Sequence, residues 1–176
     1  MVGTARQRTL RLVLLSQLGV LLFVLKIAMA GLPNIEPVSL LVMVYTVTLG
    51  RWALIPIYLY VALEYMVWGL NLWSICYLYI WLLLWVLSRL LRRMNSALGW
   101  AVLSGAFGMS FGALCALVYI PVDGWAFAFS WWVSGIPFDA LHCAGNFFMA
   151  LALFSPLKKW MEKALQKIGG FTPPNL

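Results

Sequence analysis

The sequence predicts an all-helical integral membrane protein with six transmembrane helices, a short second span and both termini in the cytoplasm. Of the 176 residues, 64% are hydrophobic and 10% are charged, whereas a soluble domain carries about 25% charged residues. The apolar residues form long runs, most of them near the length that crosses a bilayer, and short basic clusters separate these runs. We therefore expect a single transmembrane domain over residues 1–176.

Six spans are expected, in chain order at residues 10–31, 38–49, 52–70, 75–88, 98–120 and 137–155. A turn follows the first span because two prolines, Pro33 and Pro37, bracket a polar segment. The second span ends at Gly50 and is so short that it would cross only a thinned bilayer or the inside of a bundle. Glu64 interrupts the third span, and a turn at Asn71 ends it.

Basic residues and turn signals bound the last three spans. Arginines from Arg89 onward end the fourth span, and Pro121 lies in the turn that ends the fifth. The aromatic segment 125–135 is expected to be a loop or an interfacial helix. Pro137 suits the first turn of a helix, where its missing N–H costs little, so we expect the sixth span to begin there. Pro156 leads into a basic amphipathic tail that would lie on anionic lipid.

The placement of charge predicts the orientation of the six helices. With both termini cytoplasmic, 11 of the 12 lysines and arginines lie in cytoplasmic segments. The other one, Lys26, lies within the first span, while Glu36 and Asp123 fall in outside loops. Because basic residues favour the cytoplasmic side, this distribution supports every crossing, including the short second one.

One face of the sixth span carries the polar side chains around which we expect a binding pocket. Asp139, His142 and Asn146 fall at i, i+3 and i+7, so they share a helical face. A charge at the bilayer centre costs about 3 kcal/mol, so such groups normally face protein or a water-filled cavity. Together with Lys26 and Glu64, these residues lie in the outer half of the predicted membrane, which predicts a cavity that opens outward.

Loops and aromatic side chains are expected at the mouth of this cavity. The loop that holds Asn34 and Glu36 and the aromatic segment 125–132 would form its roof. An aromatic cleft with a few polar groups suits a flat heterocycle. The aromatic residues near the expected mouth are Tyr60, Trp68, Tyr77, Tyr79, Trp131 and Trp132.

Each polar candidate also has a structural explanation. Asp139 follows the proline that would start the helix, where a carboxylate stabilises the first turn. Lys26 and Glu64 would either neutralise each other as an ion pair or hold a charged end of a substrate. One histidine and one aspartate make a poor metal site, since zinc takes three or four protein ligands. We therefore expect neither a metal nor a cofactor.

Small residues repeat every four positions along the fifth span, at Ser104, Gly108, Gly112 and Ala116. Such a ridge allows another helix to approach closely. It predicts packing inside the bundle, with a docking surface for a partner as the alternative.

Three segments resemble the substrate-binding S components of energy-coupling-factor transporters. They are L-P-N-I-E-P-V at 32–38, L-L-V-M-V-Y-T at 40–46 and G-I-P-F-D-A-L-H-C-A-G-N at 135–146. The resemblance covers most of the chain and implies an outward-facing pocket for a water-soluble vitamin, a precursor or a metal ion. It also implies a membrane T component and two cytosolic ATPase subunits as partners in the plasma membrane of a prokaryote. The pocket residues it implies are Asn34, Glu36, Asp139, His142 and Asn146.

We therefore expect a high-affinity binding subunit for a small polar heterocycle, without catalysis of its own and without nucleic acid as a partner. Glu64 or Asp139 would accept hydrogen bonds from the ligand, and a tryptophan such as Trp68 or Trp132 would stack on its ring. The sequence has no Walker A loop, no serine-nucleophile motif and no His-Glu-x-x-His. Two alternatives stay open: a small membrane enzyme with Asp139 and His142 as acid–base partners, and a purely structural bundle.

Overall fold

The computed structural model describes residues 5–32 and 34–168, and every regular element within them is helical. In chain order the elements are α1 (Ala5–Ala28), α2 (Val38–Leu49), the 3-10 helix η1 (Gly50–Ala53), α3 (Leu54–Trp68), α4 (Leu72–Ile75), α5 (Tyr77–Leu90), α6 (Ala97–Ala116), the 3-10 helix η2 (Leu117–Tyr119) and α7 (Ile120–Ile168). The predicted all-helical fold is confirmed. Pro33, which we expected in the first turn, lies outside the described residues.

Four helical stretches of the described chain are long and apolar enough to cross a membrane, which indicates a membrane protein. They are Ala5–Ala28, Val38–Trp68, Leu72–Leu90 and Ala97–Ile168. The expected six spans are not supported by helix length and composition, because α2 continues through η1 into α3, and α6 continues through η2 into α7.

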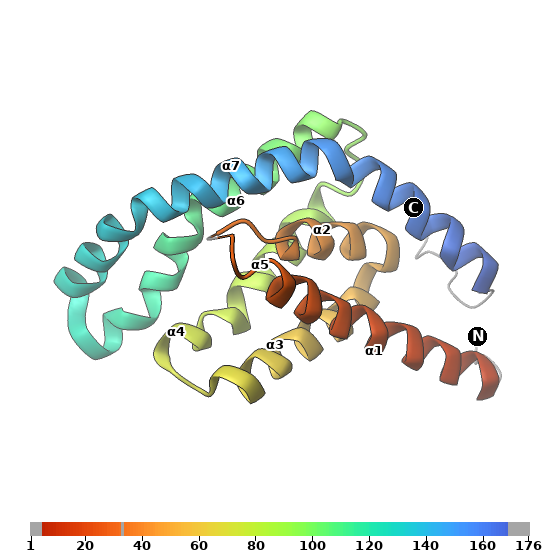
Figure 1. Ribbon diagram of the computed structural model, residues 1–176, viewed down its shortest axis with the longest axis horizontal. Helices are drawn as coiled ribbons and strands as arrows, with labels where there is room; N and C mark the ends of the chain where they lie inside the picture. The colour runs from red at the N-terminus through yellow and green to blue at the C-terminus, as the bar shows by residue number, and fades with distance from the viewer. Residues whose placement is uncertain (1–4, 33, 169–176) are drawn as a thin grey trace.

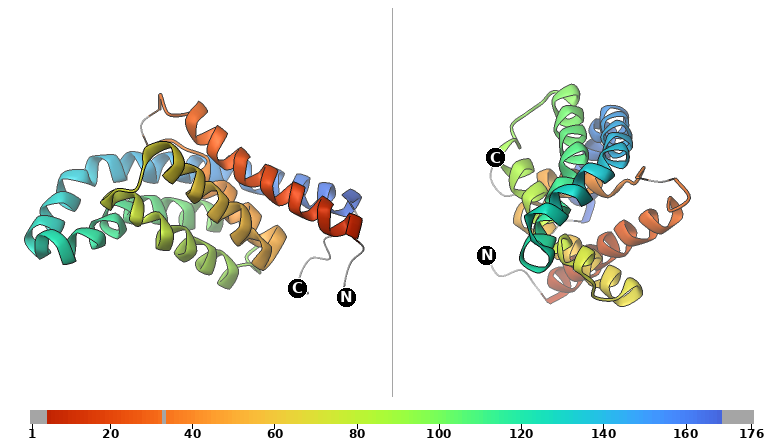
Figure 2. Two further views of the ribbon diagram at one scale, coloured as in Figure 1. Left: turned by 90° about the horizontal axis from the view of Figure 1, so that it is seen from below. Right: turned by 90° about the vertical axis from the view of Figure 1, so that its left-hand side faces the viewer.

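Two of these stretches contain a reversal of direction. Gly50 has φ 62° and Gly124 has φ 81°, a backbone conformation that favours glycine. Figure 1 and Figure 2 show α2 and α3 running in opposite directions on either side of the first reversal, and α6 and α7 on either side of the second. The start of α1 and the end of α7 lie at the same end of the molecule.

Helix α7 departs most from the sequence prediction. It begins at Ile120 and breaks at Gly124, so the segment 125–135 is helical and the expected helix start at Pro137 is wrong. Pro137 and Pro156 both lie inside the helix, where proline bends rather than ends it. The physical reason is tertiary packing. Helix α7 packs along α6, and this contact outweighs the tendency of one proline to start or end a helix (Figure 1).

The small residues of α6 make this packing close. Ser104, Gly108, Gly112 and Ala116 are all buried. A Cβ atom added at Gly108 would lie 2.8 Å from the backbone carbonyl oxygen of His142 on α7. The ridge therefore packs inside the protein, and the alternative of a docking surface is wrong for these residues because α7 covers them.

We expect Gly108→Ala to lower the free energy of unfolding by about 1–3 kcal/mol, the usual cost of overpacking. The added methyl group would push α7 away from α6, and a fall in the thermal unfolding temperature in detergent would measure the effect. Gly135→Ala is the matched control, since no atom lies within 4 Å of a Cβ added there. The control should be neutral or stabilising, and equal losses for both variants would contradict the close contact.

Candidate functional site

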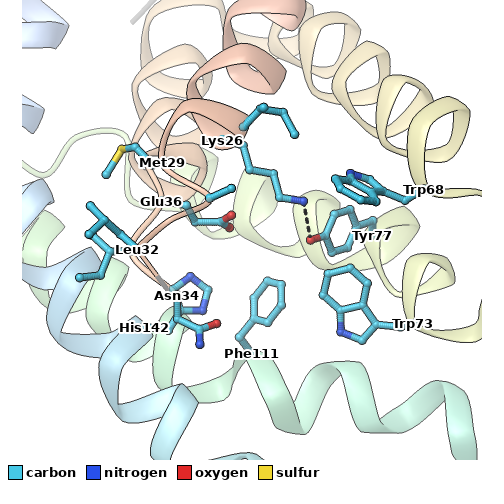
Figure 3. Close-up of a pocket in the computed structure, with 13 residues that line it drawn as sticks. Lys26, Met29, Leu32, Asn34, Glu36, Trp68, Trp73, Tyr77, Phe111 and His142 are labelled. Carbon is cyan, nitrogen blue, oxygen red and sulfur yellow. Dashed lines mark hydrogen bonds between the residues drawn. The ribbon is translucent and has the colours of Figure 1, made fainter.

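A cavity of about 260 Å³ lies between the α1–α2 loop and the surrounding helices. Figure 3 shows polar side chains on one side of it and aromatic rings on the other. The polar side chains are those of Lys26 from α1, Asn34 and Glu36 from the loop, and His142 from α7. The aromatic rings are those of Trp68 from α3, Trp73 from α4, Tyr77 from α5 and Phe111 from α6.

Lys26 is held in place by Glu64 of α3. Its Nζ forms an ion pair and a hydrogen bond with the Glu64 carboxylate, and it also donates to the Tyr77 hydroxyl at 3.4 Å. The Glu64 side chain is 2% exposed and that of Lys26 is 19% exposed. Glu64 thus lies behind Lys26 and does not line the cavity, so the acid neutralises the lysine, as one of the two sequence interpretations expected.

The α1–α2 loop brings Asn34 and Glu36 into the cavity. Asn34 adopts φ 57°, a left-handed conformation that asparagine tolerates better than most residues. Among the described residues the Glu36 carboxylate accepts no hydrogen bond, and it faces the cavity. Burial raises the pKa of Glu36 to about 7, while nearby Lys26 lowers it and Glu64 raises it further. This carboxylate therefore titrates near neutral pH.

His142 enters the cavity from α7. It is 3% exposed, and its ring lies edge-on to Phe111 with 4.9 Å between ring centroids. Within the described part of the chain, its buried Nε2 atom has no hydrogen-bond partner. A buried polar atom without a partner costs free energy, and a polar ligand in the cavity would remove this cost.

Asp139 and Asn146 lie on the same α7 face as the cavity histidine but do not line the cavity. The Asp139 carboxylate accepts a hydrogen bond from the backbone N–H of Gly112 at 2.9 Å. The Asn146 amide donates to Ser39 Oγ at 3.2 Å and to the Ser104 carbonyl at 3.3 Å. Both side chains thus bind neighbouring helices, and the expected contact with a ligand is not found. The explanation that Asp139 stabilises the first turn of its helix is also wrong, because α7 begins well before it.

Trp132 lies outside the cavity, contrary to the sequence prediction. It lines a separate apolar hollow of about 240 Å³ between α6 and α7. Trp73 and Phe111, which the sequence prediction did not include, line the cavity instead. The turn at Asn71 was the available signal, since Asn71 caps α4 and so fixes where Trp73 lies.

The cavity does not bring Asp139 and His142 together as an acid–base pair. No hydrogen bond joins the two side chains in the described structure, and His142 lines the cavity whereas Asp139 does not. Of the predicted aromatic residues, Tyr60, Tyr79 and Trp131 are also absent from the wall. The described residues contain no group of three or more histidine, cysteine, aspartate or glutamate side chains that could hold a metal ion.

Comparisons of the chain with protein-family models, with curated proteins and with solved structures found no match. The function of the cavity is therefore inferred from its geometry and chemistry.

Proposed function

We propose that the protein is a membrane receptor subunit that binds a small polar heterocycle in this cavity. The observation that carries the proposal is the unpartnered Nε2 of buried His142, which lines an aromatic-walled cavity together with Glu36. Small-molecule sites are concave and mostly apolar, with a few polar groups that orient the ligand. The volume of about 260 Å³ suits a compact ligand.

We infer that the chain crosses the membrane six times with both termini cytoplasmic. The distribution of basic residues supports this topology, and so do the reversals at Gly50 and Gly124. Helix α2 has 12 residues, about 18 Å of helix, and its burial among other helices suits a short crossing. In this topology the α1–α2 loop and the cavity lie near the outer surface.

The proposed role in transport rests on the resemblance to S components. By that resemblance the ligand is a vitamin or a precursor, and the partners are a membrane T component and two cytosolic ATPase subunits in a prokaryotic plasma membrane. The small-residue ridge of α6 does not serve as the docking face, since α7 covers it. The acid–base enzyme is less favoured because Asp139 is bound to Gly112. A purely structural bundle predicts that the buried polar groups pair with one another, whereas His142 Nε2 has no partner among the described residues.

We expect water-soluble vitamins to quench the tryptophan fluorescence of the purified protein, because Trp68 and Trp73 line the cavity. His142→Ala should weaken binding about tenfold, the loss of one hydrogen bond. Trp73→Phe should remove much of the quenching, whereas Trp132→Phe, the control in the separate hollow, should preserve it. No saturable quenching by any vitamin would contradict the proposal.

Cysteine labelling in intact cells distinguishes six crossings from four. Leu70 is 78% exposed at the end of α3, and Asn95 is exposed between α5 and α6. With six crossings, Leu70→Cys reacts with a membrane-impermeant maleimide and Asn95→Cys reacts only after permeabilisation. With four crossings the two results are reversed. Both variants are best made with Cys143→Ser, because Cys143 is the least buried of the native thiols.

A further inference from the structure

Building on the proposed function, we propose that the ligand is a flat aromatic molecule with a cationic or N–H-rich edge, such as an amidine or a protonated amino-heterocycle. The juxtaposition behind this proposal is an unpartnered carboxylate, that of Glu36, facing aromatic rings across the cavity (Figure 3). A carboxylate binds two parallel N–H groups in a bidentate manner, and the aromatic faces attract cations.

The charges around the cavity leave one acid in excess. Two carboxylates, those of Glu36 and Glu64, lie near the ammonium group of a single lysine, Lys26. Lys26 is already engaged, because its Nζ donates to Glu64 and to the Tyr77 hydroxyl. An anionic ligand would find one N–H of Lys26 left to bind, and it would lie beside the Glu36 carboxylate, which repels it. A cationic ligand meets Glu36 without disturbing the pair.

The remaining polar groups suit N–H donors as well. His142 Nε2 is buried without a described partner and can accept one hydrogen bond in the tautomer protonated on Nδ1. The Asn34 side-chain amide can both donate and accept. The rings of Trp73, Tyr77 and Phe111 line the opposite side, where they can contact both faces and edges of a flat ligand (Figure 3).

Benzamidine and benzoate form a matched pair of probes with similar shape and opposite charge. We expect benzamidine to quench the tryptophan fluorescence of the full-length protein with an affinity at least about tenfold higher than that of benzoate. This comparison uses the unmodified chain, so it does not depend on whether a variant folds. Equal affinities, tighter binding of benzoate, or no binding of either probe would overturn the inference.

Glu36→Gln tests whether the carboxylate is responsible. It should lower the affinity for benzamidine about tenfold or more and leave benzoate unchanged or tighter. Asp123→Asn, at an exposed acid outside the cavity, is the control and should leave both affinities unchanged. If vitamins quench the fluorescence but benzamidine binds no more tightly than benzoate, the receptor proposal stands and the inferred positive charge of the ligand is wrong. If no vitamin and neither probe binds, both proposals are wrong.

The pH dependence provides a second readout. The groups that face or adjoin Glu36 are Lys26 on α1, Tyr60 and Glu64 on α3, Tyr77 on α5 and His142 on α7. Because the pKa of Glu36 is raised to about 7, its charged form is depleted below that pH. The affinity for benzamidine, which stays protonated, should therefore fall as the pH is lowered through 7. Glu36→Gln should abolish this dependence, and a pH profile that is the same in wild type and variant would contradict the role of Glu36.

Discussion

The ion pair between Lys26 and Glu64 is the interaction on which the cavity depends. It joins α1 to α3 in an environment where either charge alone would be unfavourable, and removing one partner of a buried pair typically costs about 3–5 kcal/mol. The pair also orients Lys26 toward Tyr77, whose ring lies 5.3 Å from Nζ. Three helices are thereby fixed around one lysine, and the α1–α2 loop lies beside this arrangement.

The close contact between α6 and α7 determines which polar side chains reach the cavity. Because glycines bring the two helices together, one carboxylate oxygen of Asp139 and the amide nitrogen of Asn146 form hydrogen bonds with α6 and α2. His142 lies between them in sequence, yet its ring turns toward Phe111 and the cavity. One face of α7 thus carries two side chains that bond to neighbouring helices, Asp139 and Asn146, and between them a histidine that is available to a ligand.

Much of this architecture is predictable from the sequence, and the failures have physical causes. Helix α2 has the bounds expected for the second span, 38–49, because Pro37 and Gly50 bound it with local signals. The expected helix start at Pro137 is wrong, because packing against α6 overrides the preference of that proline. Likewise, the shared face of Asp139, His142 and Asn146 follows from helical periodicity alone. Which of them meets the cavity depends on interhelical distance, which a single sequence does not encode locally.

The length of α7 has a mechanical consequence. His142 lies near its middle and Lys167 near its end, so about 25 residues, or nearly 40 Å of helix, separate the two. Over that lever arm a tilt of about 5° at the histidine displaces the far end by roughly 3 Å, less whatever Pro156 absorbs by bending. A rearrangement too small to alter the cavity visibly would therefore be amplified at the opposite end of the molecule.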